Sequence, residues 1–403
     1  MSGMVIDCFA GGGGASQGIE EALGRPCDIA INHDPKAIAM HEANHPLTHH
    51  VTEDIFEADL KRMVDGRHVE LMWASPDCTS HSRAKGGTPR KSGLRILPWA
   101  VHRHAEAVTP DVIIMENVAE IQKWGPLGDD GKPVKSREGE EYRRFVDAMG
   151  GLGYTFQCRE LTAADFGAPT TRRRWYAVLR RDGGRIAWPD QTHGDGDMLH
   201  EDWVPASSCI DFDDAGRSIF DRERPLAEAT RRRITRGIEK FVLQSPDIVG
   251  GNAAFITKFY HTGTGQRVSE PMHTITTSQG HFGFVTAFLV SYYGTGQPIS
   301  AAKPLPTITT KDRFGLVTVE VDGETFAIAD VKLRMLRPEE LKLAQGFPRD
   351  YIIDRYADGS RVPRKQQVKM IGNSVVPVMA RRLVEANVGQ GLAHVPCGEG
   401  EGE

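Results

Sequence analysis

Short apolar runs alternate with helical patterns through the first half of this 403-residue chain, and this alternation constrains the fold more than any other feature. Strands are expected at 4–9, 28–32, 69–74, 111–116, 154–161 and 174–180. Helices are expected at 15–23, 35–44, 97–108 and 138–150. Strands that alternate with helices predict an α/β domain built on a doubly wound, mostly parallel sheet.

The alternation of strand and helix patterns ends near residue 186. An internal repeat has one copy at 263–285 and another at 294–317, and both contain Gly-Thr-Gly-Gln and Thr-Ile-Thr-Thr. Two copies are too few for a solenoid, so they predict two β-rich units with Thr-rich strands in one small domain. Helical patterns then return at 334–344 and after the motif at 367–377.

These changes divide the chain into three parts. We expect a catalytic α/β domain formed by 1–185 together with 353–388. A β-rich domain at 186–352 is expected to interrupt it. The Gly- and Glu-rich tail at 389–403 is expected to be disordered.

Composition excludes several classes of protein. The net charge of −5 argues against a generally basic surface, so any contact with nucleic acid must use local basic patches. The six cysteines form no CxxC pair, which favours a reduced, cytoplasmic protein without a disulfide framework or a zinc site. No apolar run approaches the ~20 residues that span a bilayer, and a core strand begins almost at once. We therefore expect neither a membrane anchor nor a signal peptide.

Polar residues follow three of the expected strands. The first strand runs into the glycines at 11–14, Cys78 follows the strand at 69–74, and Glu116 ends the strand at 111–116. In an open parallel sheet the carboxyl ends of the strands meet at one crevice. The sequence therefore predicts a site that combines a nucleophile, an acid and a nucleotide-type glycine loop. The glycine loop alone is equally consistent with a plain tight turn, because it lacks the full GxGxxG spacing.

Cys78 differs from Cys8, Cys27 and Cys158, which we expect to be small buried hydrophobes. Pro76 ends the strand before it, and no acidic residue occurs from 79 to 105. The cations of this stretch are Arg83, Lys85, Arg90, Lys91, Arg95 and Arg103. A cationic neighbourhood favours the thiolate and attracts phosphate. The alternative is a solvated basic loop.

Two further groups of residues, a set of histidines and a basic stretch, can be explained by structure alone as well as by function. His41, His45 and His49 have helical spacing, but Pro46 interrupts that helix and no carboxylate or cysteine joins them. We favour surface histidines over a metal site, and we predict no bound metal. The basic stretch around Arg231 and Arg232 is equally consistent with a solvated helix face and with a phosphate-binding face.

The ordered motifs resemble those of the DNA cytosine-5 methyltransferases over nearly the whole α/β part. The first motif, Asp7-x-Phe9-x-Gly11-x-Gly13-Gly14, resembles the family's first S-adenosylmethionine motif. Pro76-Asp77-Cys78 resembles its nucleophile motif, and Glu116-Asn117-Val118 its Glu-Asn-Val motif. The segments 170–174, 334–348 and 372–375 resemble its later motifs. The insert at about 186–330 lies where the family has its target-recognition domain.

This resemblance implies a Rossmann-like, S-adenosylmethionine-dependent enzyme that methylates C5 of a flipped cytosine in a specific duplex DNA sequence. Cys78 would attack C6, Glu116 would bind N3 and the exocyclic amine, and Arg172 and Arg174 would hold O2. The implied cofactor-binding residues are Asp7, Phe9, Ala10, Gly11, Gly13, Gly14, Asn32, His33, Asp54, Ile55, Pro76, Leu97, Asn373, Ser374 and Val375. The implied DNA contacts are Ser82, Arg83, Lys85, Arg95, Arg231, Arg232, Thr276 and Thr309.

Three positions depart from the family pattern. Asp77 stands where the family usually has proline, Asn32 where a ribose-binding glutamate is usual, and Thr170 where glutamine is usual. Two alternatives stay open: an RNA cytosine-5 methyltransferase, and a catalytically silent DNA-binding protein. The leading hypothesis is a monomeric bacterial or phage enzyme that acts on double-stranded DNA, with a cognate restriction endonuclease as a partner that is not physically bound.

Overall fold

The computed structural model describes most of the chain. The described residues are 3–76, 96–128, 132–196, 198–244, 246–259, 263, 265–278, 280–291, 318–321 and 324–388. The predictions for Cys78 and its basic loop, for the second repeat copy up to residue 317 and for the tail at 389–403 lie outside them.

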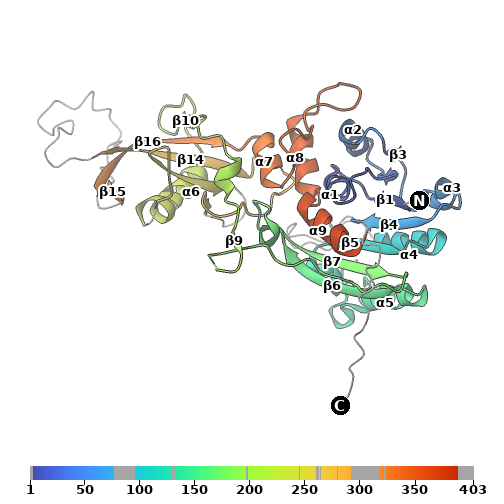
Figure 1. Cartoon of the computed structure of the whole chain (residues 1–403). Helices are drawn as coiled ribbons and strands as arrows, with labels where there is room; N and C mark the ends of the chain where they lie inside the picture. The colour runs from blue at the N-terminus through green and yellow to red at the C-terminus, as the bar shows by residue number, and fades with distance from the viewer. Residues whose placement is uncertain are drawn as a thin grey trace, which may run out of the picture.

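A seven-stranded sheet forms the larger half of the molecule (Figure 1). Its strands are β1 (Met4–Cys8), β2 (Ile29–Ile31), β3 (His49–Val51), β4 (Val69–Ala74), β5 (Val112–Asn117), β6 (Thr155–Thr162) and β7 (Arg173–Arg180). Their order is β3-β2-β1-β4-β5-β7-β6, and all neighbours pair in parallel except β7, which is antiparallel to β5 and β6. The prediction of a doubly wound, mostly parallel sheet is confirmed.

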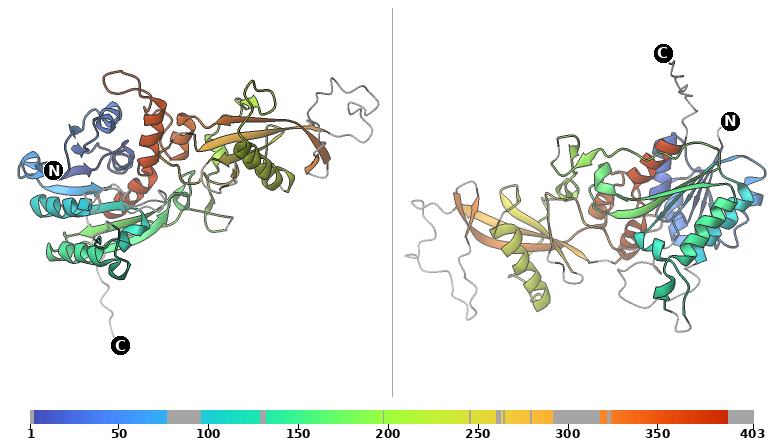
Figure 2. Two further views of the ribbon diagram at one scale, coloured as in Figure 1. Left: turned by 180° about the vertical axis from the view of Figure 1, so that it is seen from behind. Right: turned by 90° about the horizontal axis from the view of Figure 1, so that it is seen from below.

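Helices cover both faces of this sheet. One face carries α3 (Leu60–Val64), α4 (Leu97–Val108) and α5 (Glu140–Gly151), and the other carries α1 (Gly14–Leu23) and α9 (Pro377–Asn387). α2 (Pro35–Asn44) and α8 (Arg364–Asn373) pack against each other. Figures 1 and 2 show the C-terminal α9 beside the N-terminal α1, although these helices lie at opposite ends of the chain.

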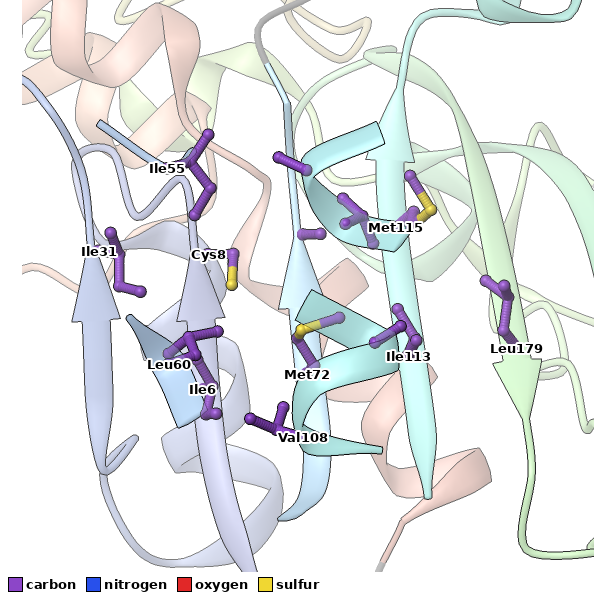
Figure 3. Close-up of a cluster of buried hydrophobic side chains, with 14 of the residues drawn as sticks. Ile6, Cys8, Ile31, Ile55, Leu60, Met72, Val108, Ile113, Met115 and Leu179 are labelled. Carbon is purple, nitrogen blue, oxygen red and sulfur yellow. The ribbon is translucent and has the colours of Figure 1, made fainter. Parts of the chain in front are cut away.

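Adjacent strand residues point to opposite faces, so each strand feeds two cores. Ile6, Met72 and Ile113 enter one core (Figure 3), where Phe145 of α5 also lies. Their neighbours on the same strands, such as Val5, enter the other core, against Ile19 of α1. Burial of both faces explains the nearly continuous apolar runs that mark these strands in the sequence.

A second, antiparallel sheet forms the other half. Its order is β10 (Arg217–Ser218), β16 (Glu324–Met335), β14 (Phe282–Ser291), β12 (Asn252–Lys258) and β11 (Ile248–Val249). β13 (Gln266–Arg267) pairs with β12, and β15 (Thr318–Val321) pairs with β16. The helix α6 (Glu228–Ile238) continues into a π-helical turn at Glu239–Leu243 and packs on β12.

The remaining elements are short. α7 (Pro338–Ala344) follows β16, and Figure 1 shows α7 and α8 between the two sheets. A separate pair joins β8 (His193–Gly194) to β9 (Glu201–Asp202). Within the described residues, 3-10 helices occur at Ala119–Lys123, Lys135–Arg137, Ala163–Phe166 and Ala206–Cys209. Among the residues that the structure describes, no helix is both long and apolar enough to cross a bilayer.

Several local predictions were wrong. The residues 274–277 of the first repeat copy do not form a strand. The helical pattern at 334–344 begins as the end of β16, and α7 starts only at Pro338, whose ring suits the first turn of a helix. Cys158 is only half-buried, whereas Cys8 and Cys27 are buried as expected.

Candidate active site

The ends of β4 and β5 lie side by side, because Ala74 pairs with Met115 in the parallel ladder. Asn117 joins the chains that leave these strands. Its Nδ2 donates a hydrogen bond to the Pro76 carbonyl at 3.0 Å, and its Oδ1 accepts one from Val118 N at 2.9 Å. The chain is thus anchored to the end of β5 two residues before Cys78, which itself lies outside the described residues.

Glu116 lies in a buried pocket of positive charge. Its side chain is 10% exposed, and its Oε1 lies 3.2 Å from Arg174 Nε and 3.9 Å from Arg172 Nη2. Neither pair has hydrogen-bond geometry, and no described group hydrogen-bonds this oxygen. A buried carboxylate needs such charge compensation. The charge of the two arginines therefore compensates the buried Glu116 carboxylate, and the structure brings together the three predicted site residues Glu116, Arg172 and Arg174.

Arg172 connects this pocket to the C-terminal helices. Its side chain is 5% exposed, and Nη1 donates to the Gly372 carbonyl at 3.0 Å. Its backbone N–H donates to Thr170 Oγ1 at 3.3 Å, so the unusual threonine braces the turn before β7.

The first repeat copy contacts the same turn. Thr171 N donates to the Met272 carbonyl and Met272 N to the Pro169 carbonyl, each at 2.8 Å. These bonds tie the segment before β14 to the turn that delivers the two arginines. The predicted DNA contact Thr276 also lies here, where its backbone packs against Gly372 and its hydroxyl bonds His281 Nδ1 at 2.5 Å.

The glycine loop between β1 and α1 has the backbone of a ligand-binding turn. Phe9 has φ +66 and Gly13, the N-cap of α1, has φ +87. A left-handed conformation is costly for an aromatic residue, and such strain concentrates at functional sites. A Cβ at Gly14 would lie 2.1 Å from the Val375 carbonyl, and Gly14 N donates to Ser374 Oγ at 3.1 Å. Beside Gly11, in contrast, no atom of the described residues lies within 4 Å of the corresponding position.

This geometry fits a nucleotide-like ligand. The loop leaves open space at Gly11, and the N-cap of α1 is Gly13, which has no side chain to bind the first-turn N–H groups. Ser374 and Val375 lie against Gly14 on the other side of the loop, while Asn373 is exposed. Leu97 begins α4 and is half-buried.

Other predicted cofactor residues support the loop or lie near it. Asn32 donates from Nδ2 to the Ala10 carbonyl at 2.9 Å and accepts from Asp34 N at 2.7 Å. His33 and Asp54 are exposed, and the Ile55 carbonyl is hydrogen-bonded to His104 Nε2 at 2.7 Å. The contacts of these residues with a cofactor stay predictions.

Asp7 lies beneath the loop and is fully buried. Its Oδ2 accepts a hydrogen bond from Ser16 Oγ at 2.7 Å. Burial raises the pKa of Asp7 to about 7, while the hydrogen bonds from Ser16 lower it.

The prediction of surface histidines was wrong for two of the three positions. His41 is 0% and His45 is 2% exposed, whereas His49 is exposed. His41 lies between Ser16 Oγ at 2.9 Å and His50 Nε2 at 2.8 Å, and burial lowers its pKa well below 6.5. Their i, i+4 spacing shows that they share a helix face, but only the packing partners decide whether that face is buried.

The predicted DNA contacts on α6 are on the surface. Arg231 and Arg232 are exposed, and Arg232 forms an ion pair with Glu228. The predicted contacts Ser82, Arg83, Lys85, Arg95 and Thr309 lie outside the described residues.

The site thus combines a Glu-Asn pair at the end of β5, Arg172 and Arg174 at the start of β7 and a glycine loop after β1. Residues 3–388 match the model of the family described as C-5 cytosine-specific DNA methylase. The chain belongs to this family.

Curated relatives of this methylase chain are similar over about half of its length. It is 30% identical over 198 residues to the Type II methyltransferase M1.HphI of Haemophilus parahaemolyticus, which covers 48% of this chain and 50% of the relative. It is 26% identical over 215 residues to the Type II methyltransferase M.AquIA of a Picosynechococcus strain, which covers 50% of this chain and 81% of that protein. The match thus spans only half of the first relative.

Solved structures share the fold over nearly the whole methylase chain. The Dnmt2 methyltransferase of S. pombe has a TM-score of 0.53 at 16% identity and covers 95% of this chain and 98% of that one. A DNMT2 mutant of Spodoptera frugiperda has a TM-score of 0.52 at 16% identity, with 96% and 99% covered.

Proposed function

We propose that this chain transfers a methyl group from S-adenosylmethionine to C5 of a cytosine in double-stranded DNA, with Cys78 as the nucleophile. The observation that supports this most directly is the position of Glu116. It is the penultimate residue of β5 and lies beside Arg172 and Arg174, next to the end of the strand that leads to Cys78.

The proposed reaction begins at the cytosine ring. The Cys78 thiolate forms a bond to C6 while N3 takes a proton from Glu116, and the Glu116 carboxylate accepts a hydrogen bond from the exocyclic amine, so negative charge does not build up on the ring. Electron density moves to C5, where bound S-adenosylmethionine would supply the methyl group and leave as S-adenosylhomocysteine. A solvent base then takes the C5 proton, the N3 proton returns to Glu116, and the bond between C6 and sulfur breaks, which restores the C5–C6 double bond and the thiolate.

The glycine loop is the proposed cofactor site. S-adenosylmethionine supplies an electrophilic methyl group when it is bound. The open space at Gly11 and the close approach of Ser374 and Val375 to Gly14 are the features that support this assignment. Asp7 would support the loop from beneath, through the hydrogen bond that its carboxyl accepts from Ser16 Oγ at the start of α1.

The two halves of the molecule have different proposed roles. Residues 1–185 and 353–388 would form the catalytic domain, and 186–352 would recognise the DNA. A base inside a duplex cannot present its ring to Cys78 and Glu116, so it must be flipped out of the stack. The bonds between Met272 and the turn at 169–171 would place the recognition domain against the pocket that receives this base.

Transfer of a radiolabelled methyl group tests the proposal. Wild-type protein should label duplex DNA at C5 of cytosine, and Cys78→Ser should not. Labelling of RNA instead of DNA would change the substrate class. No labelling of either would contradict the proposed activity and favour a silent DNA-binding protein.

A further inference from the structure

Tyr351 joins the C-terminal half of the chain to the glycine loop. It lies between α7 and α8, is 5% exposed and packs its ring against Phe347 with a centroid distance of 4.6 Å. Its hydroxyl donates a hydrogen bond to the Gly12 carbonyl at 2.7 Å. A Cβ at Gly13 would lie 2.0 Å from the same hydroxyl, so Tyr351 fills the space directly behind the loop.

A second group supports Tyr351 from α1 and α2. His45 Nε2 lies 3.4 Å from the Tyr351 hydroxyl, and His45 Nδ1 lies 3.0 Å from Glu20 Oε2. The ring centroids of His45 and Tyr351 lie 6.0 Å apart. His45 directly follows α2 and Glu20 belongs to α1, so a chain of contacts joins the tyrosine hydroxyl to both of these helices.

The bond to Gly12 sets the direction of one peptide unit. In a planar trans peptide the carbonyl of one residue and the N–H of the next point to opposite sides. The described residues contain no cis peptide bond. Because the Gly12 carbonyl points to Tyr351, the Gly13 N–H points away from it. A glycine pair has little conformational preference of its own, so this contact selects one of several accessible arrangements.

We propose that Tyr351 is a positioning residue for the methyl donor, and that its hydroxyl holds the Gly12–Gly13 peptide in the orientation that binds S-adenosylmethionine. This inference rests on the proposed function, because it requires the glycine loop to be the cofactor site. Tyr351 acts through the backbone of the loop and takes no part in bond breaking.

The substitution Tyr351→Phe removes the hydroxyl and keeps the ring. Its matched control is Tyr356→Phe, because Tyr356 lies in the same connection and its buried hydroxyl has no hydrogen-bond partner among the described residues. Calorimetric titration with S-adenosylmethionine should show a Kd that rises roughly three- to tenfold for Tyr351→Phe, the value of one hydrogen bond, and that stays at the wild-type value for Tyr356→Phe. In steady-state assays KM for S-adenosylmethionine should rise by the same factor, with KM for DNA unchanged.

Thermal unfolding of the same variants separates positioning from simple destabilisation. An unchanged cofactor Kd in Tyr351→Phe would overturn the role of Tyr351 while leaving the proposed function intact. Equal losses of affinity and of thermal stability in both variants would also overturn it, since they would show a general packing effect. If wild-type protein does not bind S-adenosylmethionine at all, the proposed cofactor site fails, and the positioning role fails with it.

Discussion

Asn117 donates a hydrogen bond to the carbonyl of Pro76 at 3.0 Å and so ties the chain that leads to Cys78 to the strand that carries Glu116. The same side chain accepts a bond from Val118 N at 2.9 Å. One buried amide therefore sets the relative position of two strand ends whose side chains must act on one ring.

The substitution Asn117→Ala should lower both stability and turnover. It leaves two buried backbone groups without partners, each of which costs about 1–3 kcal/mol of the free energy of unfolding. Asn117→Asp keeps the acceptor for Val118 and loses only the donor to Pro76. We expect it to lower kcat while the Kd for S-adenosylmethionine stays constant, as calorimetry and steady-state kinetics would measure. A kcat of Asn117→Asp equal to that of wild type would show that the hydrogen bond from Asn117 to the Pro76 carbonyl is not needed for catalysis.

The substitution Glu116→Gln should reduce kcat by roughly 10²- to 10⁴-fold, the usual contribution of a group that transfers a proton. Glu160→Gln is the matched control, because Glu160 lies on β6 and also pairs with an arginine, with its Oε2 2.8 Å from Arg173 Nε. Methyl-transfer rates at saturating DNA would compare the two variants. Equal rates in both would remove Glu116 from the proposed mechanism.

Asp7 should make stability depend on pH. Burial raises its pKa from 3.8 to about 7, so between these values the folded state holds a proton that the unfolded state has released. The stabilisation that comes from this bound proton is fully present below about pH 4. It is lost as pH rises to about 7, and the free energy of unfolding falls by up to about 1.4 kcal/mol per pH unit.

Asp7→Asn isolates this contribution from that of the buried histidines, whose lowered pKa values act in the opposite direction. Urea unfolding at pH 5.0 and 7.5 should show that the stability of Asp7→Asn relative to wild type increases with pH. A difference that does not change with pH would contradict the buried, protonated state of Asp7.

The segment 250–325 should carry target choice. Its first repeat copy is hydrogen-bonded to the turn before Arg172, and Thr276 packs on Gly372. Exchange of this segment for the equivalent one of a relative with another target should move methylation to the relative's sequence, as bisulfite sequencing would show, with cofactor affinity unchanged. A folded, active chimera that keeps the original target would place base recognition elsewhere.

The larger sheet was predictable because its central strands β1, β4 and β5 are buried apolar runs and because turn residues bound them. β3 and α3 were missed because elements of 3 and 5 residues are too short to show a periodic pattern of apolar residues. Glu116 and the glycine loop were found from their places at strand ends. That reasoning needs only the topology of a parallel sheet.

Long-range packing limited the rest of the prediction. The burial of His45 depends on Tyr351, which lies about 300 residues away and contacts it only in the folded chain. The residues 274–277 have strand-forming side chains, yet they pack against Gly372 without pairing in a sheet. Secondary-structure propensity describes the conformation that a segment prefers in isolation. For His45 and for 274–277, contacts with residues far away in the sequence determine the structure instead.

The most direct test of the account is covalent trapping with DNA that carries 5-fluorocytosine at the target. Fluorine at C5 cannot leave as a proton does, so the bond between Cys78 and C6 should persist after methyl transfer. Wild-type protein with S-adenosylmethionine should give an adduct that survives denaturation, and Cys78→Ser should give none. An adduct that forms equally with Cys78→Ser, or no adduct with an active wild-type enzyme, would contradict the assignment of Cys78 as the nucleophile.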